Sequence, residues 1–371
     1  MLKIDIILPY KEMFSPDRAS AVSISVKNSI IHSKFKDNIN VYGQFVNRPF
    51  NDINFNGFYA NKIIHFSKNL SILKQYLKKT IKDKSKKIIE IHNRPYLLNY
   101  LLIKKIVNQS LVLYFHNDPL TMKGSKSIKE RLTILRKASA VVFVSNFLKE
   151  KFLEGINESF ENIFIIPNSL DQNTNIEKIN KSKQILYVGR IVQEKGVHIF
   201  ANVVKNLSKK YKDWKFIILG STKLGYNKTS PFEKKIINNI NLLDINAQYL
   251  GYTPNAKVKK IMSESSILII PSIWEEPFGI TAIEGLSNKM AIISSEVGGL
   301  KEILDGKGIL IKNINEKKLL KELEFLINNP DKIMKYQNLS WKNYLFDKNK
   351  ISALQDGIRK KIFDKFSNNS H

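Results

Sequence analysis

Two glutamates lie eight positions apart in a stretch that passes from an apolar strand into a helix. The stretch reads PSIWEEPFGITAIEGLSNK over residues 271–289, with Glu276 in the loop and Glu284 about two turns into the helix. The first N–H groups of a helix lack intrahelical acceptors, so a phosphate binds well at Gly279 and Ile280. Glycine also allows a close approach of the backbone. Taken alone, the stretch could equally be an ordinary strand, loop and helix with two solvated carboxylates.

Two cations follow another apolar strand in YVGRIVQEKGVHIF, residues 187–200. Arg190 comes directly after Gly189 at the end of the strand, and Lys195 begins the next helix. Arginine binds a diphosphate in a fork and lysine binds it as a point charge. Two solvated surface cations are the simpler interpretation of this stretch in isolation, whereas the two stretches together favour a diphosphate site.

These two stretches carry a family resemblance. The segment from Glu276 to Glu284 resembles the E-x7-E signature of the GT4 retaining glycosyltransferases. The segment from Gly189-Arg190 to Lys195-Gly196 is similar to that family's G-R-x4-K-G element. The resemblance implies a metal-independent enzyme with the GT-B fold, in which Arg190 and Lys195 stabilise the diphosphate leaving group of a nucleotide-sugar donor.

The same resemblance implies roles for the other residues of these stretches. Glu276 would bind hydroxyls of the donor sugar, and Glu284 would bind those of the ribose. Backbone N–H groups that follow Phe278, at Gly279 and Ile280, would bind the distal phosphate. Tyr252, after the strand AQYLG, would lie near the nucleobase.

Two histidines end strands in the first half of the chain. His116 ends LVLYFH and is followed by Asn117-Asp118, which resembles the family's strand-end H-D region, whose histidine lies near the donor sugar. His92 ends KIIEIH, and Arg94 beside it could bind an acceptor phosphate. A purely structural histidine is the alternative at either position.

The first strand is followed by a loop that departs from the family. FSPDRASA, residues 14–21, stands where most members have two glycines. Ser20 and Ala21 keep the side chains small without the backbone freedom of glycine, and they are our candidates for acceptor contacts in this loop.

The elements that must position these residues alternate between strands and helices. Continuous apolar strands separated by helical segments indicate parallel sheets covered on both faces. We therefore predict an α/β protein with the GT-B fold, two doubly wound Rossmann-like domains facing across a cleft. The expected strands are 3–8, 39–45, 62–66, 87–92, 111–116, 140–145, 163–167, 185–189, 214–220, 247–251, 266–272, 291–296 and 308–311.

The predicted domain boundaries follow a polar stretch at 171–184, interpreted as a linker. Residues 1–172 form the acceptor-binding domain and residues 173–345 the nucleotide-sugar-binding domain. Residues 346–371 form a C-terminal helix that packs back on the N-terminal domain.

The chain of 371 residues has a formal net charge of +27, and most of its cations are lysines. Residues 51–150 hold 19 Lys or Arg against 6 Asp or Glu. Such a surface favours an anionic partner, and we expect peripheral contact with an anionic membrane. Segment 71–87 places apolar side chains near one face and lysines on the rest, as an interfacial helix would. A core-facing helix and a biased amino-acid composition are the alternatives, and the scarcity of arginine argues against nucleic acid.

Location and cofactors follow from what the sequence lacks. It has no cysteine, no apolar run long enough to span a bilayer and no signal peptide. We expect a cytoplasmic protein, peripheral at the inner face of the cytoplasmic membrane. The sequence has no D-x-D motif, and we expect neither a metal nor another cofactor.

The expected function is transfer of a hexose from a nucleotide-diphosphate sugar to a lipid-linked, lipopolysaccharide or other glycolipid acceptor. The expected donor is a UDP-sugar, and the anomeric configuration is retained. Three alternatives stay open: a nucleotide-sugar 2-epimerase of the same fold, a basic nucleic-acid-binding protein, and an inactive sugar-binding scaffold. The intact set Arg190, Lys195, Glu276 and Glu284 argues against the last.

Overall fold

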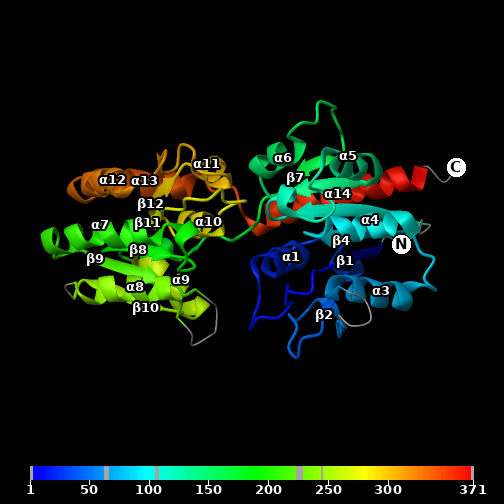
Figure 1. Ribbon diagram of the computed structural model, residues 1–371, viewed down its shortest axis with the longest axis horizontal. Helices are drawn as coiled ribbons and strands as arrows, with labels where there is room; N and C mark the ends of the chain where they lie inside the picture. Colours follow the sequence, from blue (N-terminus) through cyan, green and yellow to red (C-terminus); the bar gives the residue numbers. More distant parts are fainter. Residues whose placement is uncertain (1–2, 62–66, 105–107, 223–228, 244, 369–371) are drawn as a thin grey trace. The chain divides into compact units, whose positions relative to one another are not determined.

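The protein consists of two compact units (Figure 1). The computed structural model describes residues 3–61, 67–104, 108–222, 229–243 and 245–368. Unit 1 combines the chain up to Ser169 with the segment from Phe346 onward, and unit 2 is Leu170–Leu345. Each unit is built around one parallel sheet, so the predicted pair of α/β domains is confirmed.

The sheet of unit 1 has the order β3-β2-β1-β4-β5-β6-β7. All its strand pairs are parallel. The central strands are runs of buried apolar residues, because helices cover both faces of the sheet. The strand order reverses between β1 and β4, which is where ligands bind in open α/β sheets. The strands are β1 (Lys3–Ile7), β2 (Ile39–Gln44), β3 (Asn54–Phe58), β4 (Lys87–His92), β5 (Gln109–Phe115), β6 (Ala140–Phe143) and β7 (Ile163–Ile165).

Strand β3 was not expected from the sequence. Its residues NFNGF alternate poorly and are half-exposed, as suits an edge strand paired on one side only. The strand expected at 62–66 lies outside the described residues. The helices of unit 1 are α1 (Ala21–Ile31), α3 (Lys68–Thr80), α4 (Pro95–Lys104), α5 (Ile128–Lys137), α6 (Asn146–Leu153) and α14 (Lys348–Asn368).

The sheet of unit 2 has the order β10-β9-β8-β11-β12-β13, and all its strands are parallel. This is the doubly wound order 3-2-1-4-5-6, which reverses between β8 and β11. The loops that follow these two neighbouring strands therefore begin at the same edge of the sheet. The strands are β8 (Ser182–Val188), β9 (Lys215–Leu219), β10 (Ala247–Gly251), β11 (Ser265–Ile270), β12 (Ala291–Ser295) and β13 (Ile309–Ile311).

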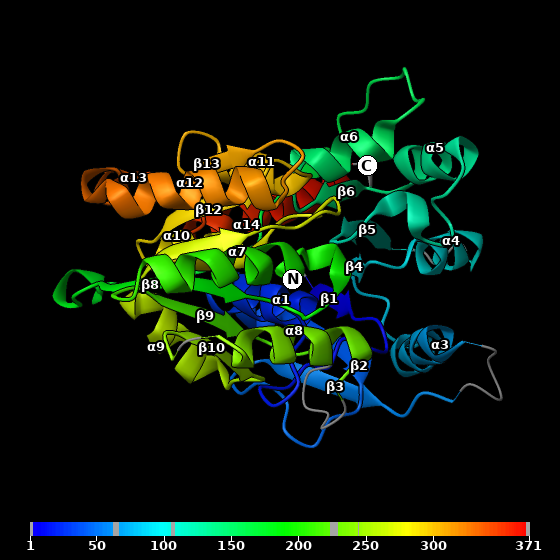
Figure 2. The same cartoon turned by 60° about the vertical axis from the view of Figure 1, so that its left-hand side comes forward.

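Helices cover both faces of this second sheet (Figure 2). Helix α7 packs against α8 and α12, whereas α10 packs against α13 and α11. Strand side chains alternate between the faces: Ile267 and Ile269 join the core under α7, while Leu268 lies against Gly285 of α10. The helices are α7 (Val197–Lys210), α8 (Pro231–Asn241), α9 (Asn255–Glu264), α10 (Ile280–Ser287), α11 (Gly299–Leu304), α12 (Glu316–Asn328) and α13 (Pro330–Lys342).

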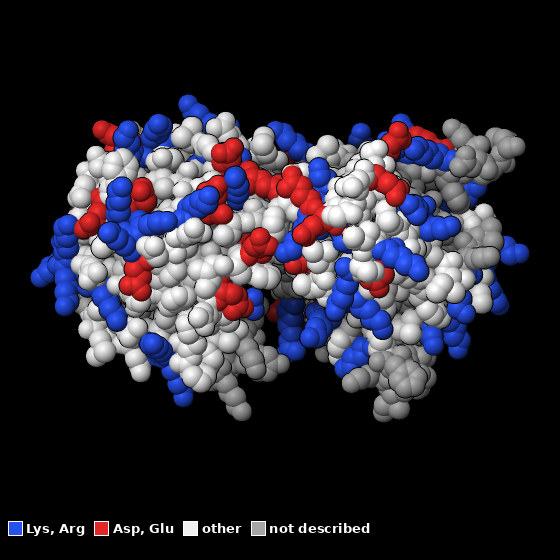
Figure 3. Space-filling view, turned by 45° about the horizontal axis from the view of Figure 1, so that its top comes forward, with Lys and Arg blue, Asp and Glu red and all other residues white. Residues whose placement is uncertain are grey.

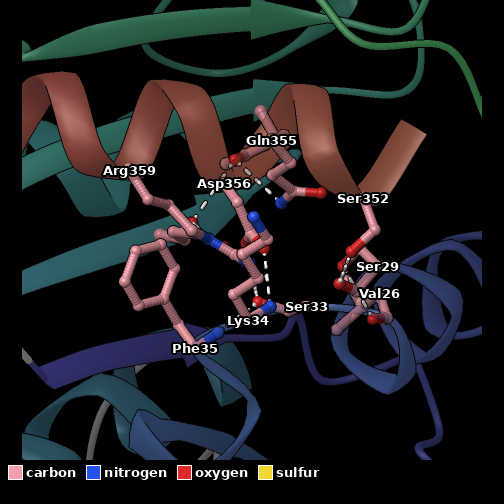
Figure 4. A network of polar contacts seen from close by, with 11 residues as sticks. Val26, Ser29, Ser33, Lys34, Phe35, Ser352, Gln355, Asp356 and Arg359 are labelled. Atoms are coloured by element: carbon pink, nitrogen blue, oxygen red, sulfur yellow. Dashed lines mark hydrogen bonds and ion pairs between the residues drawn. The ribbon is translucent and has the colours of Figure 1, made fainter. Parts of the chain in front are cut away.

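Helix α14 is an integral part of unit 1. It packs against α1, β4 and β5, and Arg359 forms a two-pronged ion pair with Glu90 of β4, at 2.8 and 3.0 Å. Asp356 accepts hydrogen bonds from the Ser33 hydroxyl at 2.6 Å and the Lys34 N–H at 2.7 Å (Figure 4). Both Arg359 and Glu90 are buried, so the helix supplies the counter-charge that Glu90 requires in the core.

The linker expected at 171–184 is wrong, because this segment is folded into unit 2. Ile176 is buried, and the Asn173 N–H donates to the Ser287 carbonyl at 3.0 Å. The Lys181 ammonium donates to the carbonyls of Ser265 and Asn288 at 2.9 and 2.6 Å. Polar composition misled the sequence interpretation, because here the polar groups bond to backbone at the amino edge of the sheet.

The amphipathic segment at 71–87 faces the core. Within α3, Ile72, Leu73 and Tyr76 are fully buried, and the helix ends at Thr80. Its apolar face is therefore occupied by unit 1 and is not available to a lipid surface, although Ile81, just past the helix, is 77% exposed. Among the residues that the structure describes, none of the helices combines the length and apolarity needed to cross a bilayer.

Candidate functional site

The loop after β8 brings its two cations to the point where the strand order of unit 2 reverses. The buried Tyr187 donates a hydrogen bond from its hydroxyl to the Arg190 carbonyl at 2.9 Å and so fixes the start of the loop. Residues Gln193–Lys195 form one turn of 3₁₀ helix, and Gly196 then starts α7 in the left-handed conformation, with φ of 67°. Arg190 lies 3.8 Å from the Glu194 carboxylate.

This loop touches the loop that follows β11. A Cβ on Gly196 would lie 1.7 Å from the Pro271 carbonyl oxygen, so only glycine fits. The Glu194 carbonyl accepts hydrogen bonds from the Ile273 N–H at 2.9 Å and from the Ser272 hydroxyl at 3.2 Å. The two loops are thus joined through their backbones.

Lys195 and Glu276 meet across this junction. The ammonium lies 2.5 Å from the Glu276 carboxylate, which also accepts a hydrogen bond from the Ser272 hydroxyl at 2.7 Å. Glu276 is 7% exposed and Lys195 is half-buried, so the pair has an open side and a covered side. Sequence analysis missed Ser272, and its only signal was a small polar residue directly after a buried strand.

Two glycines pack closely against the backbone of Glu276. The Gly299 N–H donates to the Glu276 carbonyl at 2.7 Å. Gly298 has φ of 51°, and a Cβ there would lie 2.3 Å from the same carbonyl oxygen. The carboxylate is therefore placed by close backbone packing against the start of α11.

Helix α10 begins directly after this loop without a side-chain cap. Gly279 is its N-cap, with φ of 125°, and a Cβ there would lie 2.6 Å from Leu300. Phe278 is buried beneath the turn. The N–H groups of the first turn, at Ile280 and Thr281, have no acceptor within the helix and are placed to bind an anion.

Glu284 lies in the second turn of α10, and Tyr252 follows β10. Glu284 is half-buried on α10, and burial raises the pKa of its carboxyl to about 7, with Lys259 of α9 acting in the opposite direction. Tyr252, directly after β10, is 54% exposed. The structure brings Lys195 and Glu276 into direct contact, whereas Arg190, Glu284 and Tyr252 lie on separate segments of unit 2.

In unit 1 the two strand-end histidines contact each other. His92 Nδ1 and His116 Nε2 lie 2.8 Å apart, and the two rings stack with centroids 5.1 Å apart. Burial lowers the pKa of His92 to about 3, with a further contribution from the Arg359 charge. Burial, and then His92, hold the pKa of His116 well below its ordinary value. Both rings are therefore neutral at neutral pH.

The remaining residues expected on the acceptor side have separate surroundings. Arg94 donates to the Asn93 carbonyl at 2.6 Å and is half-buried. Ser20 is the N-cap of α1, where its hydroxyl accepts from the Ser23 N–H at 3.2 Å, and Ala21 is exposed at the start of that helix. Ser20 thus has a structural task, and acceptor contacts by these three residues stay a prediction.

The geometry of unit 2 suits a diphosphate. Two cations and an uncapped helix start lie at one edge of a sheet, with a carboxylate beside them that can accept hydrogen bonds from hydroxyls. Within the described ranges, no three His, Asp or Glu side chains group as a metal site would require.

Two Rossmann-like units with parallel sheets make up the GT-B architecture, and solved structures similar to this chain share this fold. Residues 171–345 match the family described as "Glycosyl transferases group 1", and this match confirms the expected resemblance.

The chain is similar to several known proteins, and the share of the chain that is covered differs among them. An uncharacterised glycosyltransferase of Methanocaldococcus jannaschii is 28% identical over 66% of this chain and 77% of its own. The phosphatidylinositol N-acetylglucosaminyltransferase GPI3 subunit of Saccharomyces cerevisiae is 26% identical over 52% of this chain and 42% of its own. The crystal structure of Anabaena HepE in complex with UDP has a TM-score of 0.71, covers 99% of this chain and 100% of its own, and is 16% identical.

Proposed function

We propose that the protein transfers a hexose from a nucleotide-diphosphate sugar to a lipid-linked or glycolipid acceptor. The proposed donor is a UDP-sugar. The transfer retains the anomeric configuration and needs no metal. The observation that carries this proposal is the Lys195–Glu276 pair at the switch point of the unit 2 sheet, beside Arg190 and the uncapped start of α10. The choice of UDP as the nucleotide is supported by the similarity to HepE, whose crystal structure contains UDP.

In the proposed donor complex, Arg190 and Lys195 bind the diphosphate and stabilise the negative charge that develops as it leaves. The N–H groups of Gly279 and Ile280 bind the distal phosphate. Glu276 accepts hydrogen bonds from the sugar hydroxyls, and Glu284 from the ribose. Tyr252 lies beside the base.

Retention fits a front-face substitution in this proposal. The acceptor oxygen attacks the anomeric carbon on the face from which the diphosphate leaves. The bond between that carbon and the phosphate oxygen breaks, and the acceptor proton passes to this oxygen. The enzyme then needs to stabilise the leaving group and hold the sugar, and no side chain forms a covalent bond. His116 donates a hydrogen bond to a sugar hydroxyl.

The lipid acceptor is supported by the surface of unit 1 and by a relative. Ile81, directly after α3, and Ile103 of α4 are 77% and 78% exposed. Exposed lysines accompany them, at Lys78, Lys79, Lys82 and Lys104. These two helices contact each other, and we take the two apolar side chains and these lysines together as one region of unit 1. We propose that this region contacts an anionic membrane that contains the acceptor. The similarity to a phosphatidylinositol N-acetylglucosaminyltransferase subunit supports a lipid acceptor.

A panel of nucleotide-sugars tests the reaction. UDP, GDP and ADP are first compared by thermal shift, and the sugar of the stabilising nucleotide is then followed by NMR with EDTA present. We expect release of the nucleoside diphosphate and an anomeric signal of the same configuration as the donor. Inversion, or a rate that EDTA abolishes, would refute the corresponding part of the proposal.

The same spectra distinguish the epimerase alternative. A 2-epimerase would invert the substituent at C2 of the sugar, whereas a transferase moves the sugar unchanged to water or to an acceptor. The Lys195–Glu276 pair favours transfer, since the pair joins a leaving-group cation to a carboxylate that can bind hydroxyls.

A further inference from the structure

The two histidines of unit 1 have one arrangement of protons that satisfies their surroundings. The only hydrogen bond of either ring within the described residues joins His92 Nδ1 to His116 Nε2 at 2.8 Å. Because both rings are neutral, one nitrogen of this pair carries a proton and donates it, while the other accepts. The choice decides which group His116 offers at its second nitrogen.

The buried nitrogen of His92 settles the choice. His92 is 2% exposed, and its Nε2 is buried without a hydrogen-bond partner. If His116 donated, His92 would carry its proton on Nε2, as a buried N–H group with no acceptor. Buried orphan donors are rarer and costlier than buried orphan acceptors. The alternative places a bare nitrogen there, and the nearby charge of Arg359 acts against any added proton.

We propose that His92 is a positioning residue: its Nδ1–H donates to His116 Nε2, so that His116 carries its own proton on Nδ1 and presents an N–H donor to a substrate hydroxyl. The proposal rests on the proposed transferase function. It assigns to His116 the role of a hydrogen-bond donor to a hydroxyl or to developing negative charge, and excludes it as a general base through Nδ1.

The surroundings of the pair restrict both rings to this geometry. Tyr114 stacks on His92 with centroids 4.6 Å apart and planes at 9°. Asn93 holds the next turn, since its side chain accepts from the His116 N–H at 2.7 Å and its own N–H donates to the Tyr114 carbonyl at 2.8 Å. Asn93 has φ of 52°, a conformation that asparagine tolerates better than most residues.

Helix α14 contacts the residues that surround the pair, through Gln355 and Arg359 (both labelled in Figure 4). Gln355 donates to the Tyr114 hydroxyl at 2.9 Å, and Arg359 is paired with Glu90 on the same strand as His92. The last helix of the chain thus fixes the ring that stacks on His92 and supplies the cation near it. Within the described residues, the His116 ring is half-buried and its Nδ1 has no protein partner, which leaves that nitrogen for a ligand.

The protonated nitrogens can be read directly by two-bond ¹H–¹⁵N correlation on the full chain with labelled histidine. The chain has six histidines, and single substitutions assign His92 and His116. We expect both to carry the proton on Nδ1 at neutral pH. A proton on Nε2 of His92 would overturn the proposal. This readout needs no substrate, so its failure is separate from a failure of the proposed function.

Three variants test the consequence for the reaction. His92→Asn keeps an N–H donor close to the position of Nδ1, and His92→Phe keeps only the ring. We expect His92→Phe to lower kcat roughly 10–100-fold with little change in KM, and His116 to lose its single Nδ1–H form. His92→Asn should retain most of the activity. The exposed His32→Phe is the matched control and should behave as the wild type.

Equal activity of the two His92 variants would show that the donor is not needed and would overturn the role. If His92→Phe does not fold, as judged by its urea transition, the wild-type spectrum and His92→Asn still decide the question. Loss of activity in His92→Asn, with the fold intact and the His116 tautomer preserved, would contradict the proposal.

Discussion

At the residue scale, the account depends on the contact between Lys195 and Glu276. The sequence indicated both residues, together with Arg190 and Glu284, because their spacing resembles a family signature. It could not show that Lys195 and Glu276 touch, since this contact depends on the pairing of β8 with β11. Ser272 and the His92–His116 contact were also missed: the Ser272 hydroxyl bonds to the Glu194 carbonyl of the neighbouring loop, and the two histidines meet across the ends of β4 and β5.

Removal of either partner of the Lys195–Glu276 pair should impair turnover. We expect Lys195→Met and Glu276→Gln each to lower kcat about 10²–10³-fold, because each removes a group that acts on the charged leaving group or the sugar. The double variant should lose less than the product of the two effects, since the residues act together. Glu275→Gln, at an exposed position in the same loop, is the control, and steady-state kinetics are the measurement. Full activity of both single variants would contradict the assignment.

The raised pKa of Glu284 predicts pH-dependent binding of the donor. The ordinary carboxyl pKa is 4.5 and burial raises that of Glu284 to about 7, so the folded protein holds an extra proton between these values. Stability from this group is present below pH 4.5 and is lost as the pH rises through 7. The ribose hydroxyls need the ionised form, so affinity should rise with pH through about 7.

Calorimetric titration of UDP-glucose at pH 6 and pH 8 measures this effect, because its diphosphate has no second ionisation in that range. Proton uptake or release is read by repeating the titration in buffers of different ionisation enthalpy. We expect one proton to be released at pH 6, and Glu284→Gln to abolish the pH dependence. A wild-type affinity that is the same at both pH values would refute the role of Glu284.

At the scale of elements, close backbone contacts position the site, and glycines make them. Gly196 and Gly306 both have φ of 67°, but a Cβ on Gly196 would lie 1.7 Å from the Pro271 carbonyl, whereas one on Gly306 would meet nothing within 4 Å. Alanine at Gly306 should therefore cost only the backbone strain, about 1–2 kcal/mol. Alanine at Gly196 should cost more and separate the two loops.

Urea unfolding measures the stability of the two glycine variants, and nucleotide titration measures their affinity for the nucleotide. We expect Gly306→Ala to bind nucleotide as the wild type does, and Gly196→Ala to lose binding even under conditions where it remains folded. Equal behaviour of the two variants would show that the contact with Pro271 does not position Lys195.

Helix α14 should be required for the stability of unit 1. Arg359→Leu leaves Glu90 buried without its counter-charge, and we expect a loss of about 3–5 kcal/mol in the free energy of unfolding. Arg359→Leu combined with Glu90→Leu should recover much of this loss, because two apolar groups replace the pair. Chemical denaturation of the full chain measures both, and an additive loss in the double variant would contradict the pairing argument.

Much of the fold was predictable at this scale. Buried runs such as those of β5 and β11 identified the parallel sheets, and the C-terminal helix was expected. The exceptions have a common cause. Strand β3 is a half-exposed edge strand with little apolar content, and the polar segment at 171–184 bonds to backbone of unit 2. Composition describes neither case, because both depend on neighbours distant in sequence.

At the scale of the whole molecule, the net charge of +27 needs a partner or a compositional explanation. Lys and Arg are spread over both units on the face shown in Figure 3, with Asp and Glu among them. The apolar face of α3 is used within unit 1, so the proposed membrane contact depends on the exposed Ile81 and Ile103 and on the lysines of the same two segments.

Vesicle co-sedimentation tests this membrane contact. We expect binding to vesicles with anionic lipid that weakens as salt rises, and a clear decrease in Ile81→Asn combined with Ile103→Asn. Leu242→Asn and Ile245→Asn, at positions 84% and 92% exposed in unit 2, are the matched control and should leave binding unchanged. Absent or salt-insensitive binding would remove the membrane from the account.

The most direct test of the central claim is a crystal structure of the protein with a bound UDP-sugar. We predict that the diphosphate lies within hydrogen-bond distance, about 2.7–3.2 Å, of Arg190, Lys195 and the N–H of Ile280. Glu276 should contact the sugar and Glu284 the ribose. A nucleotide bound away from the edge formed by the ends of β8 and β11, or with these side chains turned from it, would contradict the account.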